Sequence, residues 1–131
     1  MKDMLQETEN LKANAAELGR LLTDHKAGDV IVMDMRQLNF WTDFFVIATV
    51  TSNTHLSGLE RHIKEFSAEK GLEILRHSRK RQHLISQHKA PHDSDDEWRI
   101  IDLGTIVIHL MTEKSRSFFE LERLWSSAIR L

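Results

Sequence analysis

Four histidines close together in one segment are the first side chains that could do chemistry. His77, His83, His88 and His92 are separated by six, five and four residues. Imidazole nitrogens bind zinc when several of them converge, for example from positions i and i+4 of a helix. His88 and His92 have that spacing, but Pro91 between them interrupts a helix. The pattern therefore favours a solvated loop over a metal site.

A second set of residues could support nucleophilic catalysis. Ser52, His109 and Asp102 together have the residue types of a hydrolytic triad. No Gly-x-Ser-x-Gly elbow, phosphate-binding Walker loop or Gly-x-Gly-x-x-Gly motif accompanies them. His109 also lies inside an apolar stretch, where a buried core histidine is the simpler explanation. The residues alone leave a small nucleotide-binding or hydrolytic enzyme using His109 and Asp102 as an alternative function, with no cofactor predicted.

Composition limits the class of protein. The 131 residues fit one domain over 1–131, and a net charge of −2 argues against binding driven mainly by phosphate attraction. The absence of cysteine excludes disulfides and thiolate chemistry, and it fits a reducing cytoplasm. No apolar run approaches the roughly 20 residues of a membrane span, and the acidic start lacks the apolar region of a signal peptide. We therefore expect a cytoplasmic protein with no membrane partner.

Hydrophobic periodicity predicts alternating helices and strands. We expect helices over about 5–26, from caps at 52–54 to Gly71, and from a Thr112 cap to about 129; strands are expected at 29–35, 44–51, 72–75, 98–103 and 105–111. The strand at 44–51 is continuously apolar, which is typical of burial on both faces. Gly104 lies in the turn between the last two strands. The order predicts a single-domain α/β (α+β) fold with a mixed sheet flanked by helices.

The segment 76–97 combines a basic stretch with an acidic one. Five Lys or Arg and no acid occur between Arg76 and Lys89, and four acids follow between Asp93 and Glu97. These stretches fit either a hairpin with oppositely charged arms or a minor contact to RNA phosphates. Both interpretations treat the segment as a loop with a basic and an acidic part.

One aromatic residue lies on an unexpected side of the last predicted helix. Its apolar stripe comprises Phe118, Leu121, Leu124, Trp125 and Ala128. At about 100° per residue, Phe119 points about 160° away from the centre of that stripe. Phe119 therefore either packs against the basic loop or the first helix, or anchors a partner protein. Trp98 is similarly open between a core role and a partner contact.

Several stretches in this order resemble the ribosomal silencing factor (RsfS/Iojap) family. They are Asp-Val-Ile-Val-Met-Asp-Met at 29–35, Thr-Asp-Phe-Phe-Val-Ile-Ala at 42–48, Ser52, His55, Trp-Arg-Ile-Ile-Asp-Leu-Gly at 98–104, Val-Ile-His at 107–109 and Leu-Glu-Arg-Leu-Trp within 116–125. Each stretch is short, but together they cover most of residues 10–130. Two features depart from the usual family pattern. The segment 76–97 is longer and more basic, so the resemblance implies a basic and acidic loop insertion there, and the strand turn is Gly104-Thr105.

The resemblance implies a nucleotidyltransferase-like fold without catalytic carboxylates. It further implies binding to the large ribosomal subunit through its fourteenth protein, a block of subunit joining, a role in large-subunit maturation and a homodimer when free. The family's interface aromatics correspond to Trp98 and, where tyrosine is usual, Phe119. Because the partner surface is basic in this family, Asp102 and Glu120 are further predicted partner-binding residues. The expected protein is a binding module rather than an enzyme.

Overall fold

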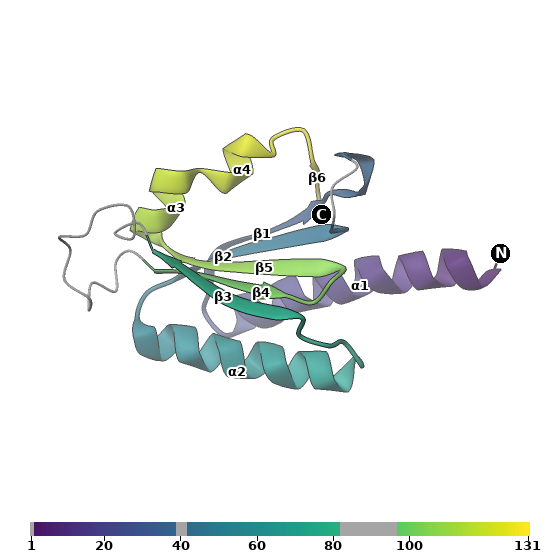
Figure 1. Ribbon diagram of the computed structural model, residues 1–131, viewed down its shortest axis with the longest axis horizontal. Coiled ribbons are helices and arrows are strands. Elements are labelled where there is room, and N and C mark those ends of the chain that lie inside the picture. The colour runs from purple at the N-terminus through teal and green to yellow at the C-terminus, as the bar shows by residue number, and fades with distance from the viewer. Residues whose placement is uncertain (1, 39–41, 82–96) are drawn as a thin grey trace.

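The computed structural model describes residues 2–38, 42–81 and 97–131. The elements, in chain order, are α1 (Lys2–Asp24), β1 (Gly28–Asp34), the short 3-10 helix η1 (Arg36–Leu38), β2 (Phe44–Val50), α2 (Asn53–Glu69), β3 (Arg76–Arg81), β4 (Glu97–Asp102), β5 (Ile106–Thr112), α3 (Glu113–Phe119), α4 (Leu121–Leu124) and β6 (Ile129–Arg130). The strands form one six-stranded sheet in the order β3-β4-β5-β2-β1-β6. α1 and α2 cover one face of this sheet, and α3 and α4 lie over the other (Figure 1).

The sheet is mixed, as the sequence predicts. β2 and β5 run parallel at its centre, and every other neighbouring pair is antiparallel. β2 is buried on both faces: Phe44, Val46 and Ala48 belong to the core on the α1/α2 side, whereas Phe45 and Ile47 belong to the core on the α3/α4 side. The continuous apolar run thus serves two cores at once, which confirms the expectation for this strand.

The two long helices form where periodicity predicts them. α2 begins after Ser52, whose side chain accepts a hydrogen bond from the His55 amide at 3.0 Å. Leu56 and Ile63 of its apolar stripe are buried against the sheet. α1 packs closely on β1 at Gly19. A Cβ added to Gly19 would lie only 2.7 Å from Val32 Cγ2, so the close approach requires glycine there. Among the helices described, none combines the length and apolar character that a membrane span requires.

The predicted third strand at 72–75 is wrong, because the strand is β3 at Arg76–Arg81. β3 is an edge strand whose register pairs Arg76 with Asp102 and Arg81 with Glu97. An edge strand needs no apolar alternation, and charged residues there protect the sheet from further pairing. The segment predicted as a loop insertion at 76–97 therefore begins as sheet. Its residues 82–96, including His83, His88 and His92, lie outside the described residues.

The prediction of one continuous helix from Thr112 to about residue 129 is also wrong. α3 ends at Phe119, Glu120 adopts a left-handed conformation with φ of 48°, and α4 then runs for one turn. The bend returns the chain to β1, where Ile129 pairs with Asp34 and Arg130 with Met33. A straight helix to 129 would forgo this strand pairing. Tertiary pairing has overridden a local helical pattern, at the cost of about 1–2 kcal/mol for a left-handed non-glycine residue.

The Gly104 turn gives a test of the β4–β5 connection. Gly104 has φ of 85°, and its amide donates a 2.7 Å hydrogen bond to Asp102 Oδ1. A Cβ there would also lie 3.2 Å from Leu75 Cδ1. We expect Gly104→Ala to lower the free energy of unfolding by about 1–2 kcal/mol in urea denaturation.

Gly58→Ala is the matched control for that measurement. Gly58 lies within α2, and a Cβ there would meet no atom within 4 Å. Because alanine favours a helix over glycine, this variant should gain about 0.5–1 kcal/mol. A Gly104→Ala protein as stable as the native chain would contradict the turn geometry.

Candidate partner-binding site

Trp98 lies at the start of β4 and is buried within the chain. Only 7% of its surface is exposed, and it is paired in register with Met111 of β5. Its indole Nε1 donates a 3.0 Å hydrogen bond to Nδ1 of His109, also on β5. The residue predicted to touch a partner therefore belongs first to the core on the α3/α4 side of the sheet.

Phe119 is the last residue of α3 and packs on Trp98. The two ring centroids are 4.5 Å apart with an interplanar angle of 49°. Phe119 is half-buried, whereas 54% of Phe118 is exposed. The predicted directions of these two rings are thus wrong, because the stripe was drawn for an unbroken helix. The bend at Glu120 separates the axis of α3 from that of the residues that follow.

Trp98 and Phe119 are part of a longer row of rings. The centroid of the Phe45 ring is 4.7 Å from that of His109 and 6.3 Å from that of Trp125. The ring centroids of His109 and Trp98 are 5.9 Å apart. The row joins β2, β4 and β5 of the sheet to α3 through Phe119 and to Trp125, the residue that follows α4. His109 is therefore a buried core histidine, as the simpler interpretation of the sequence expects.

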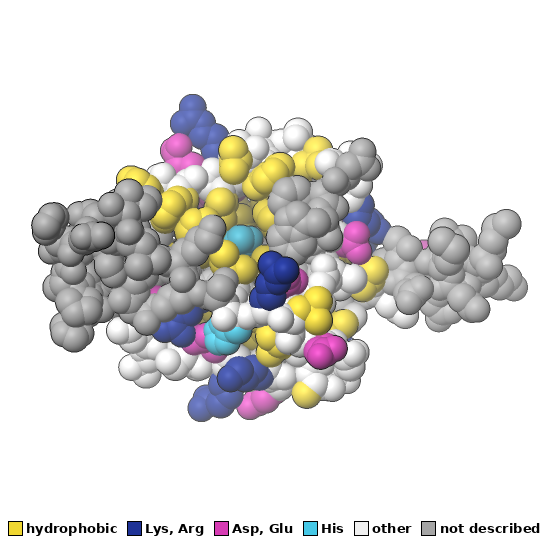
Figure 2. All heavy atoms as spheres, in the orientation of Figure 1, with side chains coloured by type: hydrophobic (Ala, Val, Ile, Leu, Met, Phe, Trp, Pro, Cys, Tyr) yellow, Lys and Arg dark blue, Asp and Glu magenta, His cyan; other side chains and the backbone are white. Residues whose placement is uncertain are grey.

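Exposed apolar side chains lie on α3 and α4, the two short helices over this face of the sheet. Phe118 touches Phe119 with ring centroids 4.9 Å apart, and 67% of Leu124 on α4 is exposed. Hydrophobic side chains gather on the part of the surface where α3 and α4 lie (Figure 2). We call Trp98, Phe118, Phe119 and Leu124 the aromatic face. In this face, Phe118 and Leu124 are exposed, whereas Trp98 is buried beneath Phe119.

The two predicted acidic partners have different surroundings. Glu120 is at the bend between α3 and α4, its side chain is 54% exposed, and it lies 3.6 Å from Arg123 Nη1. Asp102 is at the far end of β4, is only 6% exposed, and uses Oδ1 to accept the Gly104 amide hydrogen bond. Glu120 is therefore beside the aromatic face, whereas Asp102 holds the β4–β5 turn.

Arg116 fixes the corner between α3 and α4. Its buried guanidinium donates 2.8 Å hydrogen bonds to Glu122 Oε1 and to Thr49 Oγ1 of β2. Burial raises the pKa of Glu122, but hydrogen bonds from its own amide and from Arg116, together with nearby positive charge, hold that pKa below its ordinary value. The contacts tie both short helices to the sheet and so hold the aromatic face in place.

The Glu122 carboxylate should make stability depend on pH. A carboxyl with a lowered folded pKa stabilises the fold above its unfolded pKa, about 4.3, and this stabilisation is lost as the pH falls through the folded value. Glu122→Gln should lose about 1–2 kcal/mol of unfolding free energy at neutral pH. The difference from the native chain should shrink in acid, as urea titrations from pH 7 to pH 3 would show.

Glu65→Gln provides the reference for those titrations, because the Glu65 side chain is 67% exposed on α2. This variant also removes one carboxylate but leaves the Arg116–Glu122 contact in place, so it shows the effect of losing a negative charge alone. A Glu122→Gln profile that matched the Glu65→Gln profile would mean that the Arg116–Glu122 pair does not hold the corner.

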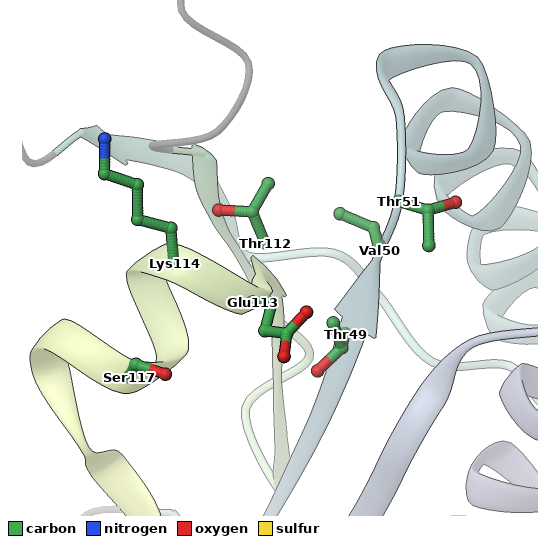
Figure 3. A pocket seen from close by; sticks show the side chains of 7 residues that line it. All are labelled: Thr49, Val50, Thr51, Thr112, Glu113, Lys114 and Ser117. Carbon is green, nitrogen blue, oxygen red and sulfur yellow. The ribbon is translucent and has the colours of Figure 1, made fainter.

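A hollow of about 470 Å³ lies where the parallel strands β2 and β5 end (Figure 3). Its lining consists of Thr49, Val50, Thr51, Thr112, Glu113, Lys114 and Ser117. The carboxyl ends of parallel strands commonly bind small ligands, and these hydroxyls could donate or accept hydrogen bonds. Neither His109 nor Asp102 lines it, so the hollow does not unite the residues of the alternative enzyme.

The triad types also serve separate structural purposes. Ser52 caps α2, His109 accepts the Trp98 indole hydrogen, and Asp102 holds the Gly104 turn. His77, the described member of the histidine cluster, hydrogen bonds through Nε2 to Glu60, which also accepts a 2.7 Å bond from Arg99. Within the described ranges, no three His, Asp or Glu side chains are placed to hold a metal ion.

Comparisons with known proteins agree with this fold. A crystal structure of a protein from Chromobacterium violaceum superposes with a TM-score of 0.67 at 25% identity, covering 90% of this chain and 85% of that one. The sequence model described as "Ribosomal silencing factor during starvation" matches residues 8–131. A protein of Treponema pallidum named ribosomal silencing factor RsfS is 34% identical over 115 residues, which are 88% of this chain and 92% of that protein.

A mouse protein named "Mitochondrial assembly of ribosomal large subunit protein 1" is also similar. It is 31% identical over 106 residues, which are 81% of this chain but only 42% of the mouse protein. The fold places the chain among mixed α/β proteins with a six-stranded sheet. The sequence matches are more specific: the chain belongs to the ribosomal silencing factor (RsfS) family.

Proposed function

We propose that this protein binds the large ribosomal subunit through the subunit's fourteenth protein and thereby blocks joining of the small subunit. The observation that carries the proposal is the packed pair of Trp98 and Phe119, with Phe118 exposed beside it and Leu124 exposed on α4. Family membership supports the ribosome as the partner, because matched relatives are named for ribosomal silencing.

The aromatic face suits a protein partner on physical grounds. Aromatic anchors near the centre of an interface commonly carry most of the binding energy. In this proposal Phe118, Phe119 and Leu124 contact the partner, and Trp98 forms the base on which they rest. Packing within the free chain lowers the entropy cost of ordering Phe119 on binding.

Glu120 and Asp102 are proposed to complement a basic partner surface. Glu120 is exposed beside the aromatic face, so its charge should chiefly raise the association rate. Asp102 is buried at the Gly104 turn, and its proposed contribution is the smaller one. The basic segment between Arg76 and Lys89 is proposed to add a minor contact to ribosomal RNA.

The proposed action is steric and needs no turnover. A bound domain at the face where the small subunit docks prevents joining without any catalytic group, so we propose a binding protein rather than an enzyme, active in the cytoplasm. The name of the mouse relative mentions assembly of the ribosomal large subunit, which supports a further proposed role in maturation of that subunit.

Sucrose-gradient sedimentation with separated ribosomal subunits tests the proposal. The protein should migrate with the large subunit and remain at the top of a gradient containing only the small subunit. A pull-down with the purified fourteenth protein should reproduce the interaction without RNA. Co-migration with the small subunit, or with neither subunit, would contradict the proposed function.

A further inference from the structure

We propose that His109 is a positioning residue for partner binding, acting through the indole N–H of Trp98. The inference deepens the proposed function and rests on it. His109 is 5% exposed in the middle of β5 and offers the partner no surface of its own. Its contact with the aromatic face is the 3.0 Å hydrogen bond that Nδ1 accepts from Trp98 Nε1.

The hydrogen bond favours one orientation of Trp98. The indole nitrogen can only donate, so Nδ1 of His109 is the acceptor. An indole could otherwise pack in more than one orientation against apolar neighbours. Because a buried N–H without an acceptor is costly, the orientation that reaches His109 is favoured.

The position of the indole in turn sets that of the exposed rings. Phe119 rests on Trp98 with centroids 4.5 Å apart, and Phe118 lies 4.9 Å from Phe119. His109 also packs against Phe45 of β2, with ring centroids 4.7 Å apart. The contacts therefore connect His109 on β5, through Trp98, to the rings on the surface of α3. The hydrogen bond from Trp98 to His109 is the polar contact in this series.

Two substitutions separate the acceptor from the bulk of the ring. In His109→Asn the amide oxygen can take the place of Nδ1, next to Cγ, so an acceptor for Trp98 is retained. In His109→Leu a side chain of similar size fills the core without any acceptor. Affinity for the large subunit, measured at a fixed salt concentration, should fall about tenfold for His109→Leu and recover most of that loss for His109→Asn.

A double-mutant cycle with Trp98→Phe tests whether His109 acts through the indole. Phenylalanine keeps a ring but has no N–H, so His109→Leu should cost little further affinity in that background. A purely structural role for His109 would give the same loss in both backgrounds. The ¹⁵N–¹H resonance of the Trp98 indole, assigned by its absence in Trp98→Phe, provides a readout on the free protein.

The indole resonance should shift and exchange faster with solvent in His109→Leu than in His109→Asn. If His109→Leu bound the large subunit with the same affinity as the native protein, this inference would be overturned and the proposed function would stand. An additive double-mutant cycle or an unchanged indole resonance would have the same consequence. If the native protein failed to bind the large subunit, the proposed function would fall and the positioning role with it.

Discussion

Phe119→Ala should reduce affinity for the large ribosomal subunit by at least about 30-fold, which corresponds to about 2 kcal/mol. The ring is half-buried on Trp98 and continues into exposed Phe118, so truncation removes the centre of the aromatic face. The loss should appear mainly as faster dissociation, since removing an apolar anchor leaves charge steering unchanged. Surface-immobilised large subunits with the variant in solution would give both rates.

Leu131→Ala is the control for this measurement. Leu131 is 45% exposed, and it lines a groove with α1 residues such as Ala16 and Gly19 rather than the aromatic face. Its removal should leave affinity within about twofold, as expected for a residue outside an interface. Equal affinities for Phe119→Ala and the native chain, with both folded, would remove the aromatic face from the proposed interface.

Trp98→Ala should lower the free energy of unfolding by about 3–5 kcal/mol. Trp98 is only 7% exposed, and loss of its side chain would open a cavity bounded by Phe119 and His109. It would also remove the hydrogen of the 3.0 Å bond to His109 Nδ1. Urea denaturation followed by far-ultraviolet circular dichroism measures the effect independently of any partner.

Trp98→Phe keeps most of the ring volume and should cost about half as much or less, because it leaves a smaller cavity. A loss below about 1 kcal/mol for Trp98→Ala would show that the indole is not packed in the core. The expected instability also makes Trp98→Ala a poor probe of binding by itself. Variants of exposed residues report on the interface more cleanly.

The parts of the fold predictable from sequence are those where burial and periodicity agree. Three features illustrate this agreement. The apolar run of β2 is buried on both faces, and the apolar stripes of α1 and α2 pack on the sheet. The Gly104 turn lies between the two strands that the sequence predicts around it. β3 escapes prediction because its pairing with β4 is non-local and its residues are mostly charged. The bend at Glu120 escapes prediction because the β1–β6 pairing that stabilises it depends on residues almost a hundred positions apart.

The residues proposed for the partner site follow from the sequence more readily than their geometry does. Phe119 and Trp98 are singled out by the helical pattern and the strand position as well as by the family resemblance, and the structure places them in contact. The helical-wheel argument chose Phe119 as the outward ring, whereas Phe118 is the more exposed one. The hydrogen bond between His109 and Trp98 is absent from the sequence-based expectations, although a tight turn at Gly104 would place His109 on the same sheet face as Trp98.

A bound copy of this protein is proposed to stop the two ribosomal subunits from joining. Light scattering measures joining directly when small subunits are added to large subunits that have already been incubated with the protein. We predict that the rise in scattering is suppressed by the native chain and largely restored when Phe119→Ala replaces it at the same concentration. A full rise with the native chain bound to the large subunit would contradict the account.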